Sequence, residues 1–123
     1  MQPRPTASEI LSVVAEVLEQ TIVPALTGPA QHQARVAASL VGIVEREIRL
    51  GPEVEARELA MLRTRLPDVG SDVREARERL VAELRAGAAD DPQREREIWE
   101  QLFASVRDDL TICKPGHDSW QGD

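Results

Sequence analysis

The sequence predicts an all-α protein, folded as a compact bundle of about five helices with an irregular C-terminal tail. Apolar residues recur at three- and four-residue steps along most of the chain, and residues that cap helices precede these stretches. No stretch alternates apolar and polar residues as a half-buried strand does. The apolar residues are mostly Leu, Val, Ile and Ala, with one Phe, two Trp and no Tyr, which disfavours an aromatic-rich β-sandwich.

The first helix is predicted to begin after Thr6, because Thr6 and Glu9 form an S/T-x-x-E capping box. Pro24 and the turn at residues 27–29 are expected to end it. Its apolar stripe is expected to consist of Ile10, Leu11, Val14, Val17, Leu18 and Ile22.

A second helix is predicted from Pro29 to Leu50, where Gly51 provides a left-handed stop and Pro52 a new start. Its apolar face is expected to consist of Val36, Leu40, Ile43, Val44 and Ile48. A third helix is predicted over residues 52–66. We expect it to bury Val54, Leu59, Leu62 and Leu66.

The fourth helix is predicted to be capped by Ser71 or Asp72 and to stop at Gly87. Its apolar positions are Val73, Ala76, Leu80 and Leu84. Asp91 is expected to cap a fifth helix that begins at Pro92. Its apolar positions are Ile98, Leu102, Val106 and Leu110. We therefore expect a helical bundle domain over residues 1–113 and a tail over residues 114–123.

Charge and cysteine content exclude several classes of protein. The net charge of −7 repels phosphate backbones and anionic lipids, so nucleic acids and membranes are not expected partners. Cys113 is the single cysteine, which rules out an internal disulfide, and no signal-peptide pattern opens the chain. We expect a cytoplasmic protein.

The residue types needed for catalysis are sparse. Among soft or imidazole metal ligands the chain offers only His32, Cys113 and His117, and Pro115 and Gly116 separate the last two, so we expect no metal site. No glycine-rich phosphate loop is present, and the carboxylates alternate with arginines that neutralise them. We expect no cofactor and no catalytic residue, and hence a protein that is not an enzyme.

One polar strip on the second predicted helix is a candidate binding site. It consists of His32, Arg35, Ser39, Gly42 and Arg46, which advance by alternating steps of three and four residues. A glycine inside a helix costs about 0.5–1 kcal/mol relative to alanine, so close approach of another group is expected at Gly42. The strip either presents donors to an anionic group or a partner protein, or serves as a packing seam in which the arginine pairs with a neighbouring helix.

Four segments carry a resemblance to a known family. They are Arg4-Pro5-Thr6, the run HQARVAASL at 32–40, the run VEREIRLG at 44–51 and the run LTICKP at 110–115. In these segments the chain resembles a bacterial family catalogued as domain of unknown function 6285, and the similarity covers nearly the whole chain.

The resemblance implies a small helical protein encoded beside an aminoglycoside-phosphotransferase-like kinase and acyl-CoA dehydrogenases. The kinase would phosphorylate a hydroxyacyl-CoA, and this chain would be its non-catalytic accessory subunit, with Arg35, Arg46 or Trp120 as candidate anchors. Two alternatives stay open: a self-associating helical protein that completes its core as a homo-oligomer, and a module that binds acyl-CoA through Arg35 and Arg46.

Overall fold

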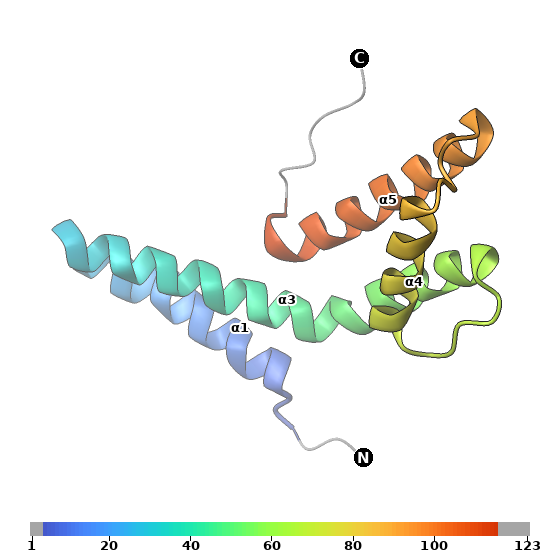
Figure 1. Ribbon diagram of the computed structural model, residues 1–123. Coiled ribbons are helices and arrows are strands. Elements are labelled where there is room, and N and C mark those ends of the chain that lie inside the picture. The colour runs from blue at the N-terminus through green and yellow to red at the C-terminus, as the bar shows by residue number, and fades with distance from the viewer. Residues whose placement is uncertain (1–3, 116–123) are drawn as a thin grey trace. The chain divides into compact units, whose positions relative to one another are not determined.

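The computed structural model describes residues 4–115, and over that range the chain is helical and contains no strand. The predicted all-α fold class is therefore confirmed. The helices are α1 (Ala7–Val17), the π-helical η1 (Leu18–Ile22), α2 (Val23–Ala25), α3 (Gly28–Arg65), α4 (Val73–Arg85) and α5 (Pro92–Cys113) (Figure 1). Trp120 and the rest of the predicted tail beyond Pro115 lie outside the described residues.

The chain falls into two compact units. The first holds residues up to 51 together with 112–114, and the second is built mainly from residues 52–111. This division describes which residues pack together within each unit and does not test domain boundaries. The single helical domain over residues 1–113 therefore stays a prediction.

Local capping signals fix the helix starts as predicted. The backbone N–H of Glu9 donates to Oγ1 of Thr6 over 3.2 Å, and the N–H of Thr6 donates to Oε2 of Glu9 over 3.1 Å, which completes the capping box. Asp72 rather than Ser71 caps α4, because its Oδ1 accepts from the N–H of Arg74. Asp91 likewise accepts from the N–H of Arg94 at the start of α5. Each cap satisfies an amide that the helix itself leaves without a partner.

The predicted break at Gly51 and Pro52 is wrong, because α3 runs without interruption from Gly28 to Arg65. Gly51 does not adopt the left-handed conformation that would stop a helix; among the described glycines only Gly28 and Gly87 have positive φ. A residue before proline normally avoids the α conformation because its Cβ meets the proline ring, and glycine has no Cβ. Gly51 thus lets the helix continue into Pro52, at which one backbone hydrogen bond is missing.

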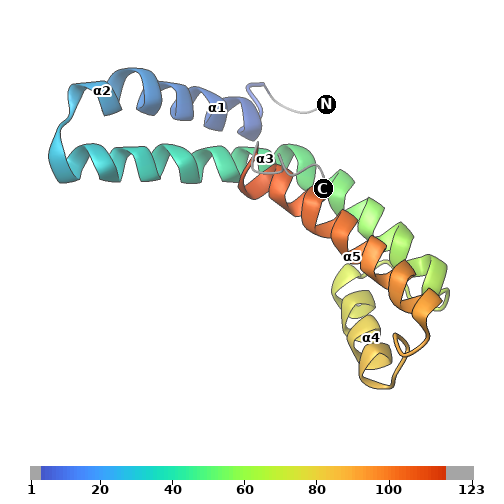
Figure 2. The same cartoon turned by 90° about the horizontal axis from the view of Figure 1, so that it is seen from above.

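The first unit is a helical hairpin made of α1, η1, α2 and residues 28–51 of α3. Figure 2 shows α1 and α2 running antiparallel to this part of α3. The hydroxyl of Ser8 donates to Oε1 of Glu45 over 2.8 Å near the open end, and Nε2 of Gln31 donates to the carbonyl of Val23 over 3.0 Å near the turn. Two side-chain hydrogen bonds therefore join the helices close to both ends of the hairpin.

Small residues of α3, and not the predicted branched ones, are buried in the first unit. Ala34 and Ala38 are buried, whereas Val36, Leu40, Val44 and Ile48 are between 44% and 56% exposed. On α1 and η1, Ile10, Val14, Val17 and Ile22 are exposed, while Leu11 and Leu18 are half-buried. The larger members of the first two apolar stripes therefore lie mostly outside the core of this unit. Alanine side chains allow two helix backbones to approach closely, and that contact leaves the larger side chains outside.

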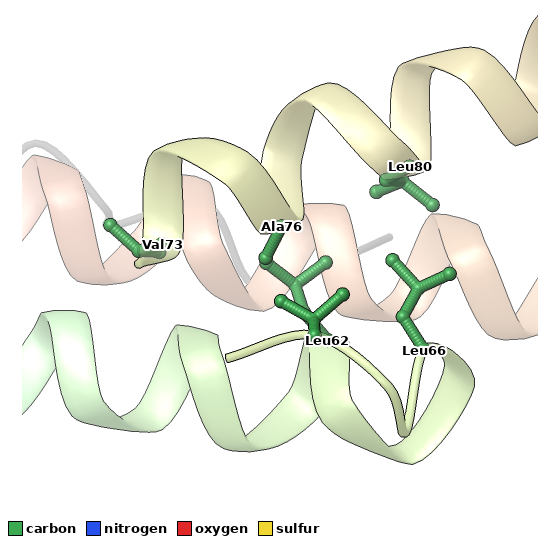
Figure 3. Packing of buried hydrophobic residues seen from close by; sticks show 6 residues of the cluster. Leu62, Leu66, Val73, Ala76 and Leu80 are labelled. Carbon is green, nitrogen blue, oxygen red and sulfur yellow. The ribbon is translucent and has the colours of Figure 1, made fainter. Parts of the chain in front are cut away.

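The second unit has a core of leucine, valine and alanine side chains from the end of α3, the following loop and α4. Figure 3 shows Leu62 of α3 and Leu66, the residue directly after α3, lying against Ala76 and Leu80 of α4. Leu66 is 1% exposed and Ala76 is fully buried. The predicted burial of Val54, Leu62 and Leu66 in this segment is confirmed, and Leu59 packs partly buried against the cluster.

Ion pairs between helices surround this core. Arg57 of α3 reaches Asp108 of α5 over 3.2 Å, and Nε of Arg77 on α4 donates to Oε1 of Glu58 on α3 over 2.6 Å. These contacts bear out the expectation that the arginines and carboxylates of this segment neutralise one another. Burial, with the nearby Glu58 carboxylate, raises the pKa of Asp109 above its ordinary value.

Candidate functional site

The structure places the described members of the predicted polar strip along the hairpin part of α3. His32, Arg35 and Ser39 are exposed, and Gly42 and Arg46 are half-buried. Trp120, the remaining predicted anchor, lies outside the described residues. The strip is therefore a continuous polar surface whose two ends differ in exposure.

Gly42 and Arg46 have a structural partner in the first unit. Nε of Arg46 donates to the backbone carbonyl of Ile112 over 2.7 Å, at the C-terminal end of α5, where carbonyls lack partners within the helix. A β-carbon at position 42 would lie 3.1 Å from Nη1 of the same arginine. Glycine at this position makes room for the Arg46 guanidinium, which lies over the helix surface. This close approach explains why a glycine stands inside the helix despite its cost in helix stability.

The two arginines of the strip are too far apart to hold one anionic group. Arg35 and Arg46 are eleven residues apart on one helix, which corresponds to roughly 16 Å along its axis. A phosphate bound by two arginines needs both guanidinium groups within hydrogen-bond distance. The structure does not bring these two side chains together, so Arg35 stands as an exposed cation and Arg46 as a contact to α5.

Beside the polar strip, the hairpin carries an exposed apolar surface, here called the hairpin face. In α3 its residues follow one another at four-residue steps, and Leu40 is the most exposed of these at 56%. The hairpin face consists of Ile10, Val14, Val17, Val36, Leu40, Val44 and Ile48.

The residues of the hairpin face lie on one side because of helix geometry. At 100° per residue, the α1 members are offset on average by roughly a quarter of a turn from Leu11 and Leu18, which line the seam between the helices. The α3 members are offset by roughly a third of a turn, in the same rotational sense, from Ala34 and Ala38. In two antiparallel helices, offsets of this size in the same sense point to the same side. The two stripes therefore form one surface.

A second apolar surface lies on α5 in the second unit and is here called the α5 ridge. It consists of Trp99, Leu102 and Val106, which share one side of the helix at steps of three and four residues. Trp99 is 66% exposed, and its ring lies 6.3 Å from that of Phe103, centroid to centroid. The guanidinium carbon of Arg107 is 5.9 Å from the centre of the Phe103 ring, within the range of a cation–π contact. The exposed indole of Trp99 therefore lies next to Phe103, whose ring also contacts Arg107.

The second unit also contains a cavity of about 700 Å³ between the end of α3, the loop after α4 and α5. Its walls mix charges of both signs, and Arg65 pairs there with Glu97 over 3.2 Å. Nε of Arg65 and Oε1 of Gln101, two of the lining residues, are buried without a hydrogen-bond partner. Because neither atom is accessible from the cavity, a bound ligand could not reach them without side-chain movement.

Among residues 4–115, no three His, Cys, Asp or Glu side chains gather in a way that could hold a metal ion. Cys113 is exposed at the end of α5. In the same range, no helix combines the length and the apolar content required to cross a lipid bilayer.

Sequence reasoning missed the two exposed apolar surfaces. The apolar positions themselves were recognised, but their exposure was not predicted, and Trp99 was not named among them. In fact Ile98 is buried while Leu102 and Val106 are exposed. One signal could have revealed the hairpin face: the two buried alanines, 34 and 38, stand on α3 beside the branched stripe and offer a closer packing surface.

Comparison with known proteins yields one match. The model of a family described as Domain of unknown function (DUF6285) matches residues 24–117, which include α3, α4, α5 and both apolar stripes that these helices carry. No curated protein and no solved structure matches the chain.

Proposed function

The chain belongs to the DUF6285 family, and we propose that it is a non-catalytic accessory protein that binds a kinase and supports it. The expected partner is an aminoglycoside-phosphotransferase-like kinase, as the resemblance implies. That kinase would phosphorylate a hydroxyacyl-CoA in acyl-CoA catabolism and would supply all reacting groups. The accessory chain would contribute a binding surface that stabilises or activates it.

The exposure of Trp99 on the α5 ridge is the observation that carries this proposal. Tryptophan is among the residues most enriched at the energetic centres of protein interfaces, and an indole two-thirds exposed to water is a favourable anchor for a partner's pocket. Leu102 and Val106 extend the apolar contact along the same side of α5. Arg107, beside Phe103, adds a second residue type common at such centres.

The α5 ridge supports a partner contact better than the polar strip does. Arg46 already donates to Ile112, and Gly42 accommodates the Arg46 guanidinium. His32, Arg35 and Ser39 remain as exposed polar groups, which belong to the rim of an interface more often than to its centre. We assign these three residues to the rim of any contact that the first unit makes.

Co-elution of the full chain with the expected kinase tests the proposal. The two purified proteins are mixed at micromolar concentration and separated by gel filtration with light scattering, and one peak containing both proteins is expected. Val106→Asp on the α5 ridge should abolish co-elution, whereas Val81→Asp on α4, a matched exposed valine, should preserve it. Two separate peaks for the unaltered proteins would contradict the proposal. Circular dichroism verifies that both variants are as helical as the parent chain.

A further inference from the structure

We propose that the hairpin face is a self-association surface, through which two copies of this chain pack as a symmetric dimer. A helical layer is stable when its apolar side is covered by another layer, and a hairpin of two helices presents such a side to solvent. Seven branched aliphatic side chains, each 41–56% exposed, make up this side. This inference is independent of the proposed kinase contact, which uses the α5 ridge.

The scarcity of charge along most of the hairpin face favours a second copy over a partner of another kind. From residue 10 to residue 44 the charged side chains are Glu16, Glu19 and Arg35, although 30% of the whole chain is charged. Beside Ile48 the four charged residues, two acidic and two basic, balance one another. Arg35 lies on the polar strip, outside the hairpin face. Interfaces between identical subunits are more apolar than those of transient partners and are depleted of charge at their core. A copy could therefore approach with little ionic repulsion at the contact, despite its net charge of −7.

The size of the hairpin face matches what a stable dimer needs. At 1.5 Å per residue, the segment of α3 from residue 28 to residue 51 is about 36 Å long, and two adjacent helices are about 20 Å wide. The face is therefore on the order of 700 Å², close to the roughly 800 Å² that each partner contributes to a standard stable interface. The same patch serves both copies, as two-fold symmetry requires.

Residue spacing also indicates how the two copies would cross. Val36, Leu40, Val44 and Ile48 form a ridge of four-residue steps on α3, and Ile10 with Val14 forms a shorter one on α1. When ridges of this kind interdigitate, the helix axes cross at about −50°, and not at the roughly +20° of coiled coils. The dimer should therefore be two hairpins packed face to face at a steep angle.

Sedimentation analysis of the isolated full chain, with no kinase present, tests the inference. The unaltered chain should have twice its 13.6 kDa mass at concentrations on the order of 100 µM, and its melting temperature should rise with protein concentration. Leu40→Glu should weaken dimerisation at least tenfold, because it places a charge at the centre of the face. Val14→Glu, on α1, should also weaken dimerisation at least tenfold. This second variant keeps the test valid if Leu40→Glu fails to fold.

Ser12→Glu is the matched control, because Ser12 is an exposed residue of α1 on the side away from the hairpin face. It should leave both mass and concentration dependence unchanged. A monomeric parent chain across this range would overturn the inference, as would dimers that persist in both face variants. Because kinase binding is measured with different variants on a different helix, either idea can fail without the other.

Discussion

Ser8 and Glu45 connect the two helices of the hairpin across 37 positions of sequence. The Ser8 hydroxyl donates to Oε1 of Glu45 over 2.8 Å, and Nε of Arg49 donates to the same oxygen over 2.8 Å. These hydrogen bonds, first that from Arg49 and then that from Ser8, lower the pKa of the Glu45 carboxyl. The Glu45 carboxylate thus links α1 to α3 beside the apolar seam between them.

Acidification should weaken the hairpin through Glu45. A carboxyl whose pKa is lowered by folding stabilises the fold at pH values above its unfolded pKa of about 4.3, and that contribution is lost as pH falls through the folded value. Glu45→Gln should therefore reduce stability at pH 7, and the difference between the two chains should shrink as pH falls below the unfolded pKa of about 4.3. Thermal melts of both chains over this range provide the measurement. A difference that stays constant with pH would exclude the carboxylate as the cause.

Gly42 and Arg46 should be energetically coupled. Alanine normally stabilises a helix interior by about 1 kcal/mol relative to glycine, but a methyl group at position 42 would lie 3.1 Å from the Arg46 guanidinium. Gly42→Ala should thus bring less than this gain in the parent chain and nearly the full gain in an Arg46→Met background. A double-mutant cycle by urea unfolding measures the coupling. Equal effects in both backgrounds would mean that the arginine does not restrict the site.

Leu66 should be the most sensitive position of the second unit's core. Its side chain is 1% exposed, and truncation of such a leucine to alanine costs about 2–5 kcal/mol. Leu66→Ala should lower the urea midpoint by a corresponding amount, whereas Val81→Ala on α4, where the side chain is 46% exposed, should change stability by about 0.5 kcal/mol or less. Similar losses in the two variants would contradict the assignment of the core.

Coenzyme A esters should not bind through the two arginines of the polar strip. Arg35 and Arg46 lie roughly 16 Å apart along α3, and Arg46 already donates to Ile112. A ligand present at 100 times its dissociation constant would add about 2.7 kcal/mol of stability. We expect saturating ester to leave the melting temperature unchanged. A rise that Arg35→Ala and Arg46→Ala both abolish would restore the acyl-CoA alternative.

The sequence was informative where the determining contacts are local. Thr6, Asp72 and Asp91 cap helices through bonds within three residues, so their roles follow from spacing alone. The continuity of α3 depends on Gly51, which was predicted to end a helix before Pro52. The structure shows instead that Gly51 stays helical and the helix continues through Pro52.

The choice of buried face could not be read from periodicity. On α3 the branched stripe and the alanine stripe are both regular, and which one meets α1 depends on how closely the two backbones approach. The contact from Arg46 to Ile112 spans 66 residues, and no local pattern indicates it. The spacing of the polar strip therefore places its five residues along one helix, as the structure shows. The contacts of Gly42 and Arg46 with each other and with Ile112 could be found only from the three-dimensional structure.

Calorimetric titration of the expected kinase with the full chain and its Trp99→Ala variant tests the central claim most directly. If the chain acts by presenting Trp99 to the kinase, the parent should bind, and the variant should bind about 30-fold more weakly, which corresponds to roughly 2 kcal/mol. Its melting temperature should stay close to that of the parent, because Trp99 is mostly exposed. Equal affinities for the two chains, or no binding by the parent, would contradict the account.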